Sequence, residues 1–131
     1  MAFLDETGLE ELWKLIQAED DVVKALADTK ARVEVGSYAG TGKYGSSNKN
    51  SLTFDFVPKF VYITQVDVYT ANIVLLINGV TGASVVGQTS NQYRLTVSWS
   101  GNTVTWYAAS ATTGAHQVNA SSTTYKYVAI G

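Results

Sequence analysis

The sequence predicts a mainly β protein with an N-terminal helix, in which an antiparallel β-sandwich head follows a short trimeric coiled-coil stalk. Two changes along the chain indicate this organisation. Apolar residues recur every three or four positions over the first 35 residues, and the period falls to two beyond them. The charge also changes there, because residues 1–35 hold nine of the eleven acids and four of the nine bases. We therefore expect a stalk over residues 1–34 and a head over residues 35–131.

The N-terminal helix is predicted to run from about Thr7 to Val33. Thr7 and Glu10 form a capping-box pattern, in which the two side chains satisfy backbone amides at the start of a helix. In a heptad register that starts at Leu9, six of eight core positions are apolar, namely Leu9, Leu12, Ile16, Val23, Leu26 and Val33. Further apolar residues widen this stripe, which favours three parallel strands over two. A single amphipathic helix packed on its own β-domain is the alternative.

The rest of the chain is expected to form short strands. Tyr93–Trp99 alternates apolar and polar residues, a turn follows, and Thr103–Tyr107 returns as the second arm of a hairpin. Asn78-Gly79 is a second strong turn signal. Further strands are expected at Ser51–Phe56, Phe60–Tyr69, Asn72–Asn78, Ala83–Thr89 and Thr124–Ile130. Short strands separated by frequent turns are typical of an antiparallel sandwich or barrel.

A glycine-rich segment, Gly36–Ser47, lies between the helix and these strands. Three of its glycines match G-x-G-x-x-G, but the Walker pattern also needs a glycine at position 37 and a hydroxyl residue at position 44. The chain has Ser37 and Tyr44 at these positions. The dinucleotide fingerprint opens a helix, whereas strands follow here. We therefore expect a flexible connecting loop and no nucleotide site.

Residues that usually carry catalysis or bind metals are sparse. The head contains one histidine, His116, and two carboxylates, Asp55 and Asp67, and the chain has no cysteine. A hydrolase triad needs a base and an orienting group beside its nucleophile, and a glycosidase needs two carboxylates at a defined separation. Neither pattern is indicated, so we expect a protein that is not an enzyme and that has no cofactor and no metal.

The sequence also predicts that the protein does not bind nucleic acid and does not insert into membranes. The net charge is −2, whereas a protein that neutralises phosphates is usually basic. The most apolar window is far too short to cross a bilayer, so no membrane insertion is expected. The head contains 24 Ser and Thr residues after position 35, and this hydroxyl-rich composition favours an extracellular or virion protein.

Aromatic residues and polar loops are the candidates for a binding surface. Trp99 and Trp106 lie on facing strands of the hairpin, and we expect Trp99 to fill the core and Tyr107, with the opposite parity, to be exposed. Tyr and Trp give a large contact area at a low cost in conformational entropy. Loops on a rigid β-scaffold commonly carry binding. The candidate contact residues are Asn48, Asn50, Thr81, Ser84, Asn91, Gln92, Tyr107, Thr112 and His116.

Four segments of the sequence resemble segments of a known group of proteins. They are Phe3–Trp13 at the start, Gly36–Asn48 with Ser51–Lys59 in the middle, and Thr124–Gly131 at the end. Together they cover about a third of the chain. They resemble the start, the junction with the first head strand, and the ending of short tail-fibre proteins encoded by phages and prophages of gut Gram-positive bacteria.

The resemblance implies a homotrimer at the distal end of a phage tail, which attaches to a host cell-surface glycan or protein by multivalent, non-catalytic binding. It implies a virion protein that is made in the bacterial cytoplasm and released by lysis. It carries over no binding residues. The chain shows no long shaft and no evident tail-attachment domain, so attachment through other phage tail proteins stays open. Two alternatives stay open. One is a structural baseplate adaptor, and the other is a polysaccharide depolymerase, an enzyme that usually needs clustered carboxylates, whereas the head has only two aspartates.

Overall fold

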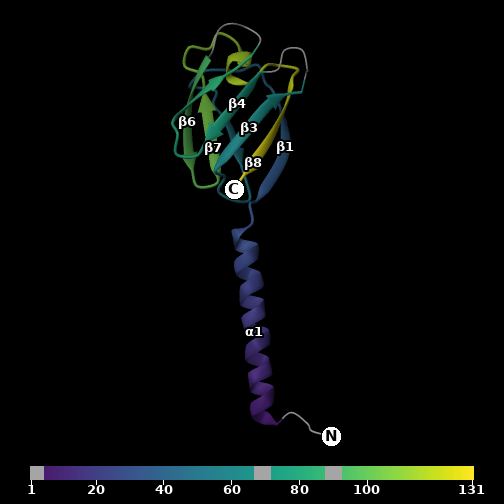
Figure 1. The fold of residues 1–131 in the computed structure, drawn as a ribbon. Coiled ribbons are helices and arrows are strands. Elements are labelled where there is room, and N and C mark those ends of the chain that lie inside the picture. The colour runs from purple at the N-terminus through teal and green to yellow at the C-terminus, as the bar shows by residue number, and fades with distance from the viewer. Residues whose placement is uncertain (1–4, 67–71, 88–92) are drawn as a thin grey trace. The chain divides into compact units, whose positions relative to one another are not determined.

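The computed structural model describes residues 5–66, 72–87 and 93–131. The chain divides into a helical unit that ends at Ala31 and a β unit from Arg32 to Gly131 (Figure 1). The predicted combination of one N-terminal helix with a mainly β head is therefore confirmed.

Helix α1 (Glu6–Thr29) begins one residue before Thr7, the predicted cap, and ends before Val33. Its cap is Asp5, because the Gly8 amide donates a hydrogen bond of 2.8 Å to Asp5 Oδ1. The first intrahelical bond, from the Leu9 amide to the Asp5 carbonyl, is 3.0 Å long. A carboxylate that accepts from the third amide is a favourable N-cap, and Thr7 lies inside the first turn. The expected capping box is therefore wrong.

The apolar stripe of α1 is exposed along the helix. The five predicted stalk positions that fall within it are between 44% and 63% exposed, and they are Leu9, Leu12, Ile16, Val23 and Leu26. Trp13, Leu15 and Val22 beside them are also exposed. Globular proteins usually cover a stripe of this width, because burying it is the main source of helix stability.

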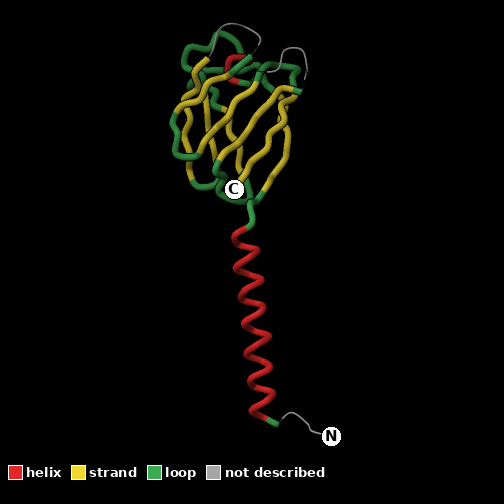
Figure 2. Tube along the Cα trace, viewed as in Figure 1, coloured by secondary structure: helices red, strands yellow, loops and turns green. Residues whose placement is uncertain are grey.

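The β unit consists of two four-stranded antiparallel sheets, whose strands are yellow in Figure 2. The strands of the first sheet lie in the order β1 (Val33–Ala39), β8 (Thr124–Ile130), β3 (Phe60–Gln65) and β4 (Ile73–Ile77). The strands of the second lie in the order β2 (Asn50–Thr53), β7 (Thr103–Tyr107), β6 (Tyr93–Ser100) and β5 (Gly82–Val85). The last strand, β8, therefore pairs with both β1 and β3.

Both sheets contribute to one core, as a β-sandwich requires. The buried residues from the first sheet are Val61, Ile63, Val74, Leu76, Tyr125 and Ala129, and those from the second are Val85, Leu95, Val97, Val104 and Trp106. Trp99 packs against this core but is only partly buried, and its Nε1 has no hydrogen-bond partner among the described residues. Tyr107, which was expected to be exposed, is instead half-buried. The alternation predicted for the hairpin is confirmed at Leu95, Val97 and Trp106.

The segment Val33–Ala39 is a strand, which corrects two expectations. The helix was expected to include Val33, and residues 36–47 were expected to form a flexible loop. Instead β1 pairs with β8 over seven residues, from Val33 opposite Ile130 to Ala39 opposite Thr124. Gly36 lies within this strand and leaves space for the Tyr127 ring, with which a Cβ atom would collide.

The other strand positions agree with the sequence pattern to within a few residues. Thr103–Tyr107 and Thr124–Ile130 are confirmed, β6 extends one residue beyond the predicted end at Trp99, and the other four strands end earlier than expected. Two of the expected strands extended into residues 67–69 and 88–89, which lie outside the described part of the chain. The Asn78-Gly79 turn is confirmed, with Gly79 at φ 85°. It joins β4 to β5, which belong to different sheets.

The strand directions divide the connections of the sandwich between two ends. The near end contains Arg32 and Gly131, whose backbones are hydrogen-bonded to each other, and the connections 54–59, 78–81 and 101–102. The far end contains residues 40–49 and 108–123, including the short helix η1 (Gly114–Gln117). Figure 1 shows η1 at the end of the β unit opposite the C-terminus.

Candidate functional site

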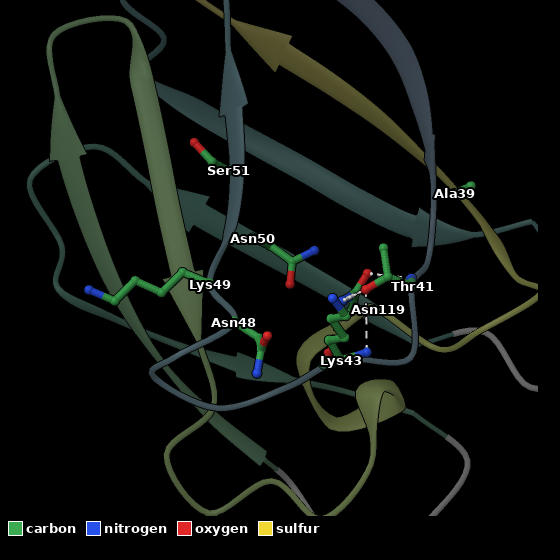
Figure 3. Close-up of a pocket in the computed structure, with 8 residues that line it drawn as sticks. All are labelled: Ala39, Thr41, Lys43, Asn48, Lys49, Asn50, Ser51 and Asn119. Atoms are coloured by element: carbon green, nitrogen blue, oxygen red, sulfur yellow. Dashed lines mark hydrogen bonds between the residues drawn. The ribbon is translucent and has the colours of Figure 1, made fainter.

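Residues 40–49 connect β1 with β2 at the far end, and the buried side chain of Asn119 holds their first half. Asn119 is 3% exposed. Its Oδ1 accepts a 3.0 Å hydrogen bond from the Thr41 amide, and its Nδ2 donates bonds of 2.9 Å to Thr41 Oγ1 and to the Lys43 carbonyl (Figure 3). The carbonyl oxygen and both N–H donors of this side-chain amide are therefore used within the protein.

Gln117 holds the second half of the same connection and is fully buried. Its Oε1 accepts from the amides of Gly45 and Ala108, both at 2.9 Å. Its Nε2 donates to the Asn48 carbonyl and to Asn50 Oδ1, both at 2.8 Å. A buried side-chain amide with every group satisfied specifies a single arrangement. The connection is thus held by the protein interior, which corrects the expectation of a flexible loop.

The glycines of this connection have geometric roles. Gly42 and Gly45 have φ values of 78° and 86°, in the left-handed region that favours glycine. At Gly40 a Cβ atom would collide with the Ala120 carbonyl oxygen. The three glycines of the G-x-G-x-x-G pattern are therefore explained by backbone geometry, two by a positive φ and one by a close contact with another backbone segment.

A shallow depression of about 330 Å³ lies beside this connection. Its lining consists of Ala39, Thr41, Lys43, Asn48, Lys49, Asn50, Ser51 and Asn119. The lining contains two lysines, three amides and two hydroxyls, and no carboxylate. In Figure 3 the side chains of Asn50, Thr41 and Asn119 gather on one side, and Lys49 extends away from them. The structure thus brings together two of the predicted site residues, Asn48 and Asn50.

Tyr107 belongs to the same region. It ends β7, one residue beyond Trp106, which pairs with Asn50 of β2. The Lys49 ammonium lies 5.5 Å from the centroid of the Tyr107 ring, within the range of a cation–π contact. A half-exposed aromatic face, an ammonium group and neighbouring amides therefore form one continuous surface. We call Lys43, Asn48, Lys49, Asn50 and Tyr107 the far-end cluster.

His116 and Thr112 form a second group at the far end. The His116 ring stacks on Tyr93, with centroids 3.4 Å apart, and its Nδ1 accepts a 3.2 Å hydrogen bond from the Thr112 amide. Desolvation lowers the pKa of His116 below 6.5, and the hydrogen bond to Nδ1 likewise requires an unprotonated nitrogen. The geometry therefore gives His116 a structural role in anchoring residues 112–116.

The remaining predicted site residues do not join these groups. Thr81 lies at the near end, and Ser84 lies on the outer face of β5 beside Arg94. Asn91, Gln92 and Asp67 lie outside the described residues. Asp55 is at the near end, where its amide donates to Glu34 Oε2 at 3.1 Å. The described candidates therefore occupy at least three places in the sandwich and do not form one surface.

Gln117 and Asn119 are the residues that sequence reasoning missed. Both lie in a segment with no periodicity, and both look like ordinary exposed loop amides in the sequence. Their partners lie 67 to 78 residues away along the chain for every bond to residues 41–50. No local pattern signals such a network.

The fold and the far-end cluster define the chain as a β-sandwich with a separate amphipathic helix and a polar surface patch. Comparisons with protein-family models, with curated proteins and with solved structures find no match to this chain. Within residues 5–66, 72–87 and 93–131, no group of three or more metal-ligating residues is present. The same residues contain no helix that is long and apolar enough to span a membrane.

Proposed function

We propose that the protein is a trimeric phage tail-fibre or receptor-binding protein, which attaches to a host cell-surface glycan by multivalent, non-catalytic binding. The observation that carries this proposal is that one chain combines two features. Helix α1 has an exposed apolar stripe, and the sandwich has a polar far-end cluster whose backbone is fixed by buried hydrogen bonds. The helix would supply assembly, and the far-end cluster would supply contact with the host. The resemblance of four sequence segments to short tail-fibre proteins gives the same function.

The stripe of α1 supports assembly through a parallel coiled coil. Fully burying one Leu, Ile or Val side chain stabilises a protein by about 1.5–3 kcal/mol, so covering eight half-exposed side chains on each helix gives a substantial driving force. The 24 residues of α1 span about 36 Å at 1.5 Å per residue. The register ends at Leu26, since Val33 belongs to β1.

The far-end cluster suits a sugar chain. Amides of Asn48 and Asn50 can bond to hydroxyls, and the face of Tyr107 offers a stacking surface. Two lysines and no carboxylate in the depression favour a glycan that carries acidic groups. The backbone beneath is already held by Gln117 and Asn119, so little conformational entropy is lost on binding. Three such surfaces on one trimer gain avidity through effective concentration.

The test is binding of the full chain to a panel of purified wall and capsule polysaccharides from Gram-positive bacteria, including acidic ones. We expect Tyr107→Ala and Lys49→Ala each to weaken binding at least tenfold. Ser98→Ala, on an exposed position of β6, is the matched control and should bind like the unaltered chain. Binding that is undiminished in both cluster variants, or no binding to any polysaccharide of the panel, would contradict the proposal.

A further inference from the structure

The two outer faces of the sandwich differ in chemistry. Most outward residues of the second sheet carry a hydroxyl group, namely Ser51, Thr53, Ser84, Thr96, Ser98, Ser100, Thr103, Thr105 and Tyr107, and the others are Gly82 and Arg94. Neighbouring hydroxyls contact each other, since Thr53 Oγ1 and Thr103 Oγ1 are 2.9 Å apart. This face is hydrated as expected for one side of an antiparallel sheet.

The outer face of the first sheet carries two apolar rows instead. Strand pairing places Val33, Ile130, Phe60 and Ile77 in one row that crosses all four strands. The next row on that face contains Val35, Val128, Tyr62 and Leu75. We call these eight residues the sheet patch. The following row is more polar, because it contains Ser37, Lys126 and Thr64 beside Ile73.

The sheet patch is open to solvent. Its six most exposed side chains range from 36% at Phe60 to 67% at Val35, and the others are Val33, Tyr62, Leu75 and Ile77. Single exposed apolar residues are normal on a protein surface, but a contiguous patch across four strands marks a contact site. None of its eight side chains is charged.

We propose that the sheet patch is the surface through which the heads of neighbouring copies of this chain contact each other. The inference rests on the trimer of the proposed function. Val33 lies four positions after Thr29, the last residue of α1. These two residues are therefore at most about 14 Å apart. Packed helices lie about 8–10 Å apart, so a coiled coil brings the Val33 residues of its copies near one another. The sheet patch begins at that residue.

Charge and symmetry support a second copy as the occupant. Copies of an uncharged patch meet without like-charge repulsion, and a contact repeated around a threefold axis closes into a ring. The hydroxylated face and the far-end cluster then stay free for solvent and host. In the proposed trimer, the apolar stripe of α1 and the sheet patch would both face other copies of this chain.

The test compares full-chain variants by light scattering over a series of concentrations. The sheet variant carries Val35→Lys and Leu75→Lys, at two exposed positions of the sheet patch. The matched control carries Thr96→Lys and Ser98→Lys, at two exposed positions on the hydroxylated face. The helix variant carries Ile16→Asp and Val23→Asp and tests the coiled coil alone. Circular dichroism checks that each variant keeps its strands.

We expect a mass of three chains for the unaltered protein. The sheet variant should dissociate at a concentration at least tenfold higher, and the control should stay within twofold of the unaltered protein. If the sheet variant loses its strands, Val35→Thr with Leu75→Thr replaces it, and a dissociation concentration raised at least threefold is then expected.

Two results would overturn the inference, and they differ in what they say about the proposed function. A trimer that the helix variant dissociates but the sheet variant leaves unchanged removes the head contact only, and the proposed trimer stands. A single-chain mass for the unaltered protein at every concentration removes both the head contact and the proposed trimer.

Discussion

Gln117 illustrates how a single residue determines the shape of a surface that it does not itself form. Its side chain reaches Gly45, Asn48 and Asn50 from below and bonds to Ala108 as well. Because Gln117 is buried away from solvent, water cannot easily replace a hydrogen bond that its side chain loses, and the former partner is left unsatisfied.

Gln117→Ala is expected to lower the free energy of unfolding by roughly 2–4 kcal/mol, because it leaves the buried amide of Ala108 and the half-buried amide of Gly45 without an acceptor. Urea denaturation of the full chain at fixed concentration measures this. The control is Asn48→Ala, whose exposed side chain makes one bond to the Tyr44 carbonyl, and we expect a loss below about 1 kcal/mol. Equal losses in the two variants would show that the network is not what holds residues 40–49.

His116 gives the stability of the head a dependence on pH. Its pKa is lowered by desolvation in the folded protein, so the unfolded chain binds a proton more readily. The contribution to stability is therefore fully present above the usual pKa of 6.5 and is lost as the pH falls through the folded value. We expect a lower urea midpoint at about pH 5 than at about pH 8. His116→Asn keeps an acceptor without this titration, and its midpoint should fall less between the same two conditions.

These residue-scale features mark the limit of prediction from the sequence. Alternation along Tyr93–Trp99 was enough to place Leu95 and Val97 in the core, because it depends only on neighbours in the chain. The burial of Gln117 and Asn119 depends on segments about 70 residues away, which no local period encodes. Asn48, Asn50 and Tyr107 were predicted as contact residues, but the sequence did not show that they lie together.

At the scale of elements, α1 and β1 show how one apolar pattern is compatible with two structures. Val33 fits the heptad that starts at Leu9, and it also fits the alternation of Val33, Val35 and Ser37 on one face of β1. Pairing with β8 decides between them, because seven residue pairs outweigh one more helical turn. The existence of helix and strands could thus be predicted, but the junction could not.

The start of α1 provides a direct test at this scale. Asp5→Ala should destabilise the helix by about 1 kcal/mol, because it removes the acceptor of the Gly8 amide. Thr7→Ala should have a much smaller effect, since Thr7 lies within the first turn and alanine is the better helix former. The helical signal in circular dichroism during thermal unfolding measures both. A larger effect for Thr7 would restore the capping box that the sequence predicted.

At the scale of the whole molecule, the two units obtain their stability from different sources. The sandwich has a core of its own, formed by both sheets. Helix α1 has 24 residues and exposed apolar side chains, and most of the stability of a helix in a protein comes from packing of its apolar face. The division of the chain into a helical and a β unit was predictable from the change of period, whereas the apolar outer face of the first sheet was not recognised in the sequence.

Dilution is therefore expected to affect the two units differently. If the helix is stable only in the proposed trimer, its circular dichroism signal should fall as the full chain is diluted below the concentration at which the trimer dissociates. The β signal should remain. The helix variant with Ile16→Asp and Val23→Asp should show the low helical signal at every concentration. A helical signal that is independent of concentration in the unaltered chain would contradict this prediction.

The central position of β8 has a consequence for how a cell makes the protein. Residues 124–130 follow every other strand in the chain, yet they lie between β1 and β3 in the first sheet. Until the ribosome has released them, β1 has no partner in its sheet, and β3 has only β4. Unpaired strand edges invite aggregation and degradation. Synthesis that stops before this strand therefore yields chains in which β1 and β3 have lost the strand that joins them in the first sheet.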